Sequence, residues 1–350
     1  MTRWAKADGA AAEGARASLR QLVPRALLAP LRRERRKRLV SLALQGGGSF
    51  GAFTWGVLDR LLERDDLAID TVSGVSAGAV NAVLLASGLA EGGPAEARRR
   101  LERFWQRVSR AQRLGRAASG TAALALELSM RMLSPYQLNP LGLNPLREIL
   151  AAEIDFARLR ETSPIRLLIG ATRVKDGRLR LFRTEEITLE AVLASACLPQ
   201  IQHAVAIEGE WYWDGGFSAN PPLRQLVLDS LADDVVLVQI TPEAQSGGAP
   251  VLLNDITRRV NQITFNGPLQ REIEALADLC AVCGRERYFR SRLCRKLRRL
   301  RLHRIAAEDV VEGLQQASAM ALDRRFLRRL REGGRQAAED WATRLAQARA

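Results

Sequence analysis

The chain has 350 residues, of which 47% are apolar, and its 53 Lys and Arg against 39 Asp and Glu give a net charge of +14. This apolar content excludes a wholly disordered protein and suffices for one large α/β domain with additions, or for two modest domains. The basic surface favours an anionic partner, either a lipid surface or nucleic acid. Because aromatic residues make up only 5% of the chain, base stacking has little support, and we expect no nucleic-acid partner.

The first segment, residues 1–38, carries much of this charge. Its eleven basic and three acidic side chains supply +8 of the net +14. We see no apolar core of a secretory signal and no run of 18 apolar residues that would cross a membrane. The pattern predicts a disordered tail, and a tail that contacts anionic lipid is the alternative. Four cysteines in no secreted pattern favour a cytoplasmic protein, either free or peripheral at the inner face of the membrane.

From residue 39 onward, short apolar runs alternate with helical patterns. LVSLALQ (39–45) predicts a strand that enters the glycine loop 46–51, and residues 52–65 repeat apolar side chains at helical spacing. TVSGV (71–75) predicts a second strand with a helix after it, and a helical pattern resumes over 95–114. Further strand-like runs cover 165–174, 178–183, 235–241 and 300–305. This alternation favours an α/β fold with three layers, α/β/α, around a mostly parallel central sheet.

The chain beyond residue 306 has a helical pattern that places Leu322, Phe326 and Leu330 on one face. We expect Gly333-Gly334 to end that helix before a last helix that contains Trp341. Before this region, the segment 292–304 is densely basic with interleaved leucines, which fits either a face for anionic head groups or a solvated strand edge.

The predicted strand over 71–75 runs directly into Gly74-Val75-Ser76-Ala77-Gly78. A strand, a sharp turn that carries a serine, and a helix are typical of a nucleophile elbow, and Gly74 and Gly78 complete its Gly-x-Ser-x-Gly motif. A hydrolytic serine usually has a histidine as its base. The chain contains only His203 and His303, so the base for Ser76 has to be sought more widely.

The glycine loop fits two kinds of chemistry. Gly46-x-Gly48-x-x-Gly51 matches a dinucleotide fingerprint, and Asp66 and Asp70 lie near the spacing of a ribose-binding acid. A nucleotide-binding oxidoreductase therefore stays an alternative, although a nucleotide fold has no need of the serine that follows. The second chemistry is an oxyanion hole, in which glycine N–H groups stabilise the charge that develops on an attacked ester carbonyl. If the two strands are neighbours, this loop and Ser76 open at the same edge of the sheet.

A candidate base lies in EWYWDGG (210–216). Asp214 precedes Gly215 and Gly216, so a close backbone approach is possible there, although Asp-Gly is also common in plain surface turns. A carboxylate is a weak base in water, but partial burial raises its pKa and with it its basicity. Two neighbouring tryptophans are candidates for these apolar surroundings, or are ordinary packing residues: Trp211 and Trp213.

Several motifs in this order resemble the patatin-like phospholipase family: QGGGSFG (45–51), GVSAG (74–78), SACLPQ (195–200), WDGG (213–216) and NPP (220–222). The resemblance covers roughly residues 40–240 and implies a patatin-like fold and a lipid acyl hydrolase without metal or organic cofactor. It implies that Ser76 is the nucleophile and Asp214 its base. The implied oxyanion donors are the N–H groups of Gly46, Gly47, Gly48 and, as in elbows generally, Ala77. Phe50 stands where the family usually has Arg or Lys, which removes a charge suited to an anionic head group.

On this basis residues 39–305 form the hydrolase domain and residues 306–350 a helical extension. A cap-like insertion at about 115–150 contains Met130 and Met132, and it either covers an acyl-chain channel or packs as a helix on the sheet. We expect a serine hydrolase of phospholipase A or lysophospholipase type, with a lipid or membrane-surface substrate and an oligomeric state left open. The alternative is an esterase with the same dyad that acts on another ester, such as an aliphatic polyester.

The remaining chemistry-bearing residues favour structural roles. His203 is eleven residues before Asp214 and would complete a triad if it reached the site, but a structural role is the commoner one. His303 lies in a strand-like run and is expected to be a packed or edge residue. A zinc site made of His303 with three cysteines fits no standard spacing: Cys280, Cys283 and Cys294. Cys197 is expected to be in the core.

Overall fold

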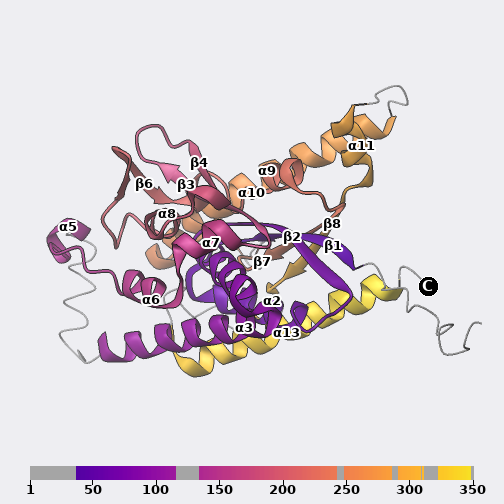
Figure 1. Cartoon of the computed structure of the whole chain (residues 1–350). Coiled ribbons are helices and arrows are strands. Elements are labelled where there is room, and N and C mark those ends of the chain that lie inside the picture. The colour runs from indigo at the N-terminus through magenta and orange to yellow at the C-terminus, as the bar shows by residue number, and fades with distance from the viewer. Residues whose placement is uncertain are drawn as a thin grey trace, which may run out of the picture. The chain divides into compact units, whose positions relative to one another are not determined.

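The protein is described here from a computed structural model, which covers residues 37–115, 134–242, 248–285, 291–308, 310 and 322–347. The chain from Arg38 onward forms one compact unit around an eight-stranded sheet (Figure 1). The strand order is β5-β6-β3-β2-β1-β7-β8, with β4 paired to β3. The strands are β1 Arg38–Leu44, β2 Leu67–Gly74, β3 Arg166–Arg173, β4 Leu179–Arg183, β5 Val205–Ile207, β6 Glu210–Asp214, β7 Asp234–Gln239 and β8 Arg301–Ala306.

The sheet is mostly parallel, as the alternation of elements predicts. The pairs β3–β2, β2–β1, β1–β7 and β7–β8 are parallel, whereas β4, β5 and β6 join in antiparallel fashion. The helices are α2 Gly51–Leu61, α3 Ala77–Gly115, α5 Pro135–Leu138, α6 Pro145–Glu153, α7 Phe156–Thr162, α8 Leu189–Ser195, α9 Leu223–Asp229, α10 Leu253–Arg285, α11 Arg292–Arg299 and α13 Arg324–Gln347. Short 3-10 turns cover Gly48–Phe50, Thr184–Glu186 and Gly215–Phe217.

Helices cover both faces of the sheet, which confirms the predicted three layers. In β1, Leu42 and Leu44 pack into the core beneath α2, α3 and α13, while Ala43 between them packs into a second core beneath α9 and α10. Val236 and Val235 of β7 divide between the same two cores. Because successive strand residues point to opposite faces, burial on both faces explains why these strands are continuous apolar runs.

Helix α3 turns back on itself. Gly92 and Gly93 have non-helical dihedral angles, and the second half of α3 starts after them. A Cβ on Gly88 would lie 2.3 Å from the Cα of Ala97, so the two halves pack in backbone contact. Trp105 on the returning half donates its Nε1–H to Asn81 on the first half at 3.2 Å. The returning half therefore leads back to the sheet edge from which α3 starts.

The prediction that Gly333-Gly334 interrupts the last helix is wrong, because α13 continues through both residues. The reason is packing against α2. A Cβ on Gly334 would lie 2.1 Å from the carbonyl oxygen of Phe53, and a Cβ on Gly56 would lie 2.0 Å from that of Arg331. Glycines here let two helices approach closely, and the burial that results outweighs their low helix propensity.

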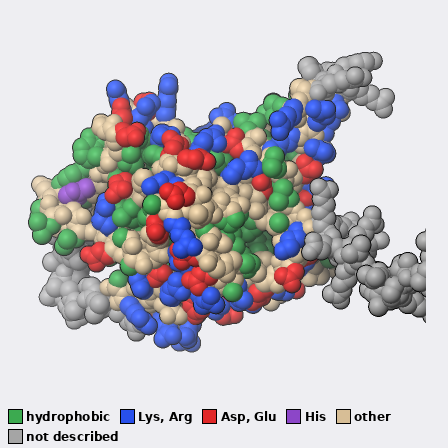
Figure 2. All heavy atoms as spheres, viewed as in Figure 1, with side chains coloured by type: hydrophobic (Ala, Val, Ile, Leu, Met, Phe, Trp, Pro, Cys, Tyr) green, Lys and Arg blue, Asp and Glu red, His purple; other side chains and the backbone are tan. Residues whose placement is uncertain are grey.

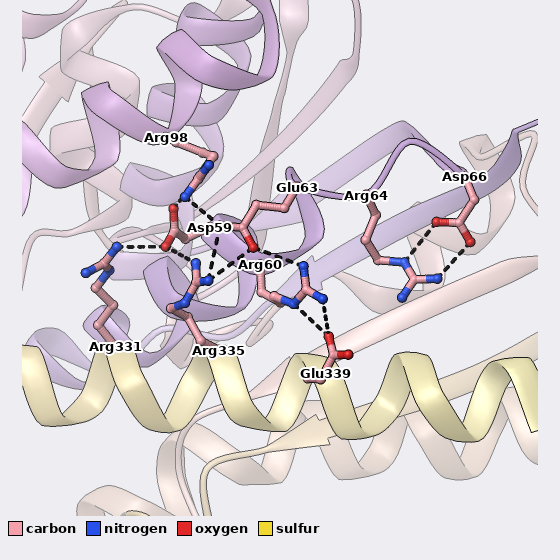
Figure 3. Close-up of polar contacts among 9 residues, drawn as sticks. All are labelled: Asp59, Arg60, Glu63, Arg64, Asp66, Arg98, Arg331, Arg335 and Glu339. Atoms are coloured by element: carbon pink, nitrogen blue, oxygen red, sulfur yellow. Dashed lines mark hydrogen bonds and ion pairs between the residues drawn. The ribbon is translucent and has the colours of Figure 1, made fainter.

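An ion-pair network fixes α13 on α2 and α3 (Figure 3). Asp59 of α2 is buried and accepts hydrogen bonds from Arg98 at 2.7 Å, from Arg331 at 2.8 Å and from Arg335. Burial acts to raise the pKa of Asp59, but these guanidinium groups hold it below its ordinary value. A second pair links Arg60 to Glu339 one turn further along α13. The C-terminal helix is thus an integral part of the layer beneath the sheet.

Three further predictions concern the basic tail, the cap-like insertion and the basic segment 292–304. Residues 1–36 of the predicted tail 1–38 lie outside the described residues, and so do Met130 and Met132 of the cap-like insertion. The basic segment 292–304 is not one strand, because Arg292–Arg299 forms helix α11 and only its end belongs to the edge strand β8. In the described part of the chain, no helix is long and apolar enough to cross a membrane. On the face that Figure 2 shows, Lys and Arg side chains are interspersed with Asp and Glu side chains.

Candidate active site

The serine elbow and the glycine loop lie side by side at the carboxyl edge of the sheet. Strands β1 and β2 are parallel neighbours, with Leu44 opposite Gly74, so the segments that follow them meet as expected. Ser76 has a φ of +52°, the strained left-handed conformation of an elbow serine. A Cβ on Gly78 would lie 2.1 Å from the carbonyl oxygen of Leu44, so only glycine lets α3 start this close to β1.

The backbone of the elbow is held from α8. The Ser76 N–H donates both to the carbonyl oxygen and to the Oγ of Ser195, each at 3.0 Å. Gly74 belongs to the same tight arrangement, since a Cβ there would lie 2.7 Å from the carbonyl of Gly78. These contacts offset the strain at Ser76 and fix where its hydroxyl lies.

The N–H of Gly46, the first residue of the glycine loop, forms a hydrogen bond within the protein. Gly46 donates to Oδ1 of Asn220 at 2.7 Å, and a Cβ on Gly46 would lie 2.8 Å from the Cβ of Ser76. The expectation that the Gly46 N–H serves as an oxyanion donor does not fit this geometry. By contrast, the N–H groups of Gly47, Gly48 and Ala77 have no acceptor among the described residues.

Gln45 anchors the loop from the other side. Its Oε1 accepts the N–H groups of Ile240 and Thr241 at 2.8 and 2.9 Å, and its Nε2 donates to Asn266 of α10 at 3.0 Å. Asn266 in turn donates to the carbonyl oxygen of Pro242 at 2.8 Å. The Gln45 side chain is fully buried, so this satisfied polar network fixes the loop against β7 and α10.

Asp214 ends β6 and is completely buried. Its Oδ1 accepts the N–H of Gly216 at 2.8 Å, whereas its Oδ2 has no hydrogen-bond partner among the described residues. Burial raises the pKa of Asp214 to about 7, with the Gly216 N–H and the nearby Ser76 hydroxyl acting in the opposite direction. The carboxyl group thus has the basicity of a group suited to proton transfer near neutral pH.

The glycines after Asp214 bring its turn against the elbow. A Cβ on Gly215 would lie 2.2 Å from the carbonyl oxygen of Gly170 and 2.7 Å from the Val75 side chain, directly before Ser76. A Cβ on Gly216 would lie 2.3 Å from the ring of Phe265 in α10. The structure therefore brings together the two predicted motifs; the lack of a side chain at Gly215 permits this contact, and the lack of one at Gly216 permits the approach of α10.

Of the two roles left open for the neighbouring tryptophans, the structure does not support burial of Asp214. Residues alternate between the two faces of β6, so Asp214 shares a face with the buried Tyr212, and the tryptophans point the other way. Trp211 is 53% exposed. Cys197 is close to Asp214 instead, because its carbonyl oxygen accepts the Asp214 N–H at 2.8 Å. Cys197 is buried as predicted, and burial with the nearby Asp214 raises the pKa of its thiol to about 12.

Neither histidine is hydrogen-bonded to Ser76 or Asp214. The Nε2 of His203 lies 3.2 Å from the carbonyl oxygen of Pro135, and its ring stacks on Tyr136 at 4.1 Å between centroids. His303 lies on the edge strand β8 with Nε2 at 2.7 Å from Asp234, at the opposite end of β7 from the site. Both contacts fit the predicted structural roles.

The cysteines of α10 and α11 are separate from His303. The Sγ atoms of Cys283 and Cys294 lie 2.8 Å apart, and Cys280 contacts the carbonyl oxygen of Leu297. No group of three or more potential metal ligands is present among the described residues.

Sequence reasoning missed the residues that support the site. Ser195 and Asn220 lie in the motifs SACLPQ and NPP, so the motifs mark them, but nothing in the sequence shows which N–H each accepts. Phe265 and Asn266 carry no sequence signal at all. Phe50, at the position where a basic residue is usual, packs its ring on Phe326 of α13 at 6.1 Å between centroids.

The chain was compared with protein-family models, curated sequences and solved structures. A family model described as patatin-like phospholipase matches residues 42–227, just over half of the chain. No curated protein sequence matches. Among solved structures, the chain is similar to VipD from Legionella pneumophila, with 14% identity, 87% of this chain and 66% of that chain covered, and a TM-score of 0.44. It is also similar to a chain of the ExoU–SpcU complex from the type III secretion system of Pseudomonas aeruginosa, with 16% identity, 87% and 68% covered, and a TM-score of 0.29. The chain spans about two thirds of the length of each of these two proteins.

Proposed function

The chain belongs to the patatin-like phospholipase family, and from this premise we propose that it hydrolyses carboxylic esters of lipids with Ser76 as nucleophile and Asp214 as base. One observation carries the proposal. A serine in the strained elbow conformation lies beside a fully buried carboxyl group that has one oxygen free and a pKa raised to about 7. A buried aspartate with this pKa has the proton affinity that a histidine supplies in other serine hydrolases.

In the first half of the reaction, the Ser76 Oγ attacks the ester carbonyl carbon while its proton passes to the free Oδ2 of Asp214. The carbonyl oxygen becomes an anion, and the N–H groups of Gly47 and Gly48, with that of Ala77, are the donors we assign to it. Each such donor lowers the barrier by about 3–4 kcal/mol in comparable enzymes. When the tetrahedral intermediate collapses, the ester C–O bond breaks, and Asp214 returns the proton to the leaving alcohol.

In the second half, water attacks the acyl-Ser76 ester. Asp214 accepts a proton from that water, the same N–H groups hold the second oxyanion, and collapse releases the fatty acid. The proton then returns from Asp214 to the Ser76 Oγ, which restores the free enzyme. We assign Gly46 a structural role and not that of an oxyanion donor. Its N–H donates to Asn220 and fixes the start of the glycine loop, which keeps the N–H groups of the next two residues directed at the site.

The substrate class is tested by release of carboxylic acid from three substrates at equal ester concentration. These are mixed phospholipid vesicles, a monomeric short-chain ester and a dispersed aliphatic polyester, with Ser76→Ala as the blank. We expect the wild type to release fatty acid from the vesicles and Ser76→Ala to release none above background. Hydrolysis of the short-chain ester and the polyester without vesicle hydrolysis would contradict the lipid assignment and support the alternative esterase.

Attachment to a membrane surface by the basic tail stays a separate prediction, because that segment lies outside the described residues.

A further inference from the structure

A cavity of about 310 Å³ lies between α2, the returning half of α3 and the start of α13. Its volume is at the lower end of the range of small-molecule sites, about 300–1,000 Å³. Two tryptophans, Trp55 and Trp105, are nearly fully buried and form part of its wall. Apart from Leu327 the remaining lining is polar, and arginine is its most frequent residue, so the cavity combines apolar and cationic surfaces.

Four arginines contribute to the lining: Arg110, Arg324, Arg328 and Arg331. Arg331 binds Asp59 and stacks over the Trp55 ring at 4.8 Å. The other three form no ion pair with any carboxylate of the described residues. Two glutamates also line the cavity, Glu102 and Glu332, so its formal charge is +2. Convergent guanidinium groups without carboxylate partners are the usual arrangement for binding an oxyanion.

Two further hydrogen-bond donors in the wall have no partner in the described structure. They are the Nε1–H of Trp55 and the hydroxyl of Ser109, whose residues are 5% and 2% exposed. The Nε of Arg331 is likewise buried without an acceptor. These three atoms are shielded beneath the cavity surface, so the exposed guanidinium groups of the lining arginines are the donors that an oxyanion in the cavity would meet.

The cavity is fixed in place and close to the site. The network on Asp59 and Glu63 holds α13 on α2, so the helix that carries three of the four lining arginines is fixed in place without a ligand (Figure 3). The Trp105 ring also packs against the glycine loop, since a Cβ on Gly51, the last residue of that loop, would lie 3.2 Å from the ring. A ligand in the cavity would therefore be separated from the oxyanion loop by one tryptophan ring.

We propose that this cavity is a second binding site, distinct from the Ser76 site, for the phosphate group of a small amphiphilic ligand. A phosphate supplies up to two negative charges and several acceptor oxygens for the guanidinium groups, while the indole rings contact the apolar part of the ligand. The phosphate comes either from a phospholipid head group or from a soluble organic phosphate. This inference goes beyond the proposed hydrolysis and does not depend on it.

The test is calorimetric titration of the full-length Ser76→Ala protein, which keeps a lipid ligand intact. The probes are sn-glycerol 3-phosphate and dihexanoylphosphatidic acid below its micelle concentration, with phosphate-free dihexanoylglycerol as the reference, all at constant ionic strength. The site variant is Arg324→Gln/Arg328→Gln. The matched control is Arg325→Gln/Arg329→Gln, which removes two exposed charges from the same turns of α13 but on residues that do not line the cavity.

We expect binding of both phosphate probes to weaken about tenfold or more in the site variant and to change by less than about twofold in the control. If dihexanoylphosphatidic acid binds more than about tenfold tighter than glycerol 3-phosphate, the phosphate comes from a lipid head group. If the two probes bind with equal affinity, it comes from a soluble organic phosphate. Both results support the site. Three outcomes would overturn it: no phosphate probe binds, the two arginine pairs weaken binding equally, or dihexanoylglycerol binds as well as the phosphatidic acid. Because the readout is binding and not turnover, and glycerol 3-phosphate contains no carboxylic ester, failure of the hydrolysis proposal would leave its binding result unaffected.

Discussion

The side-chain oxygen of Asn220 accepts the Gly46 N–H at 2.7 Å, which joins the glycine loop to a turn 174 residues later in the chain. The Nδ2 of Asn220 donates to the carbonyl oxygen of Phe265 at 3.2 Å, so the same side chain also holds α10. Asn220 is completely buried, and we propose it as a positioning residue for the loop whose next N–H groups are the proposed oxyanion donors. Its removal tests whether the position of this loop matters for turnover.

Asn220→Ala should lower kcat about 10–100-fold while KM changes by less than about threefold, because a misplaced oxyanion loop stabilises the transition state less than before. Asn220→Asp keeps the acceptor for Gly46 and should retain more activity than the alanine variant. The control is Asn261→Ala, an exposed asparagine on α10. Steady-state kinetics on a monomeric ester measure this, and a change in KM alone would contradict the positioning role.

The pH dependence of kcat/KM should follow Asp214. Only the deprotonated carboxylate accepts the Ser76 proton, and burial raises the pKa of Asp214 to about 7. For a neutral ester, kcat/KM should rise about tenfold per pH unit below that value and level off above it. A profile already flat from pH 5 upward would show that Asp214 titrates like a solvent-exposed aspartate and would contradict the account of the base.

Asp214→Asn should stabilise the protein at alkaline pH. The folded-state pKa of about 7 lies above the ordinary 3.8, so the folded protein retains a proton that the unfolded chain releases. The free energy of unfolding of the wild type therefore falls as pH rises from about 4 to about 7, and it stays lower above that. Asparagine removes this cost, so the variant should be more stable by about 2–4 kcal/mol at pH 8 and nearly equal at pH 4.

Urea denaturation at the two pH values measures this difference. Asp340→Asn, at an exposed position of α13, serves as the control and should change stability little at either pH. Equal stability of Asp214→Asn and wild type at pH 8 would show that the charged carboxylate is not destabilising.

Gly334→Ala tests the packing of α13 on α2. Its Cβ would lie 2.1 Å from the Phe53 carbonyl oxygen, so the helices must move apart, which should cost about 1–3 kcal/mol of stability. Gly284→Ala is the matched control in another helix, where a Cβ meets nothing within 4 Å, and it should be neutral or slightly stabilising. Guanidinium denaturation compares the two, and an unaffected Gly334→Ala would remove the reason given for the uninterrupted helix.

Much of the fold follows from the sequence because strands buried on both faces are unbroken apolar runs, as in β1 and β7. The short strands β5 and β6 have no such run, and β6 has alternating exposed and buried aromatics around Asp214. The sequence pattern does not predict helix α10, because its apolar residues, such as Val260 and Leu269, do not lie on one face.

The site was predictable to the extent that local motifs define it. The elbow and the Asp-Gly-Gly turn require particular residues at particular spacings, so Ser76 and Asp214 could be proposed before their proximity was visible. Long-range contacts carry no such signal. The acceptor of the Gly46 N–H, the anchoring of Gln45 on Asn266 and the packing of Phe50 on Phe326 all join segments more than 170 residues apart.

The most direct test of the central claim is hydrolysis of a short-chain chromogenic ester by the wild type, Ser76→Ala, Asp214→Asn and His203→Ala, each checked for folding by circular dichroism. The account predicts losses of about 10⁴-fold for the first two variants, and near-normal activity for His203→Ala, whose ring is held by Pro135 and Tyr136. Comparable loss in a folded His203→Ala protein, or retained activity in Asp214→Asn, would contradict the serine–aspartate dyad.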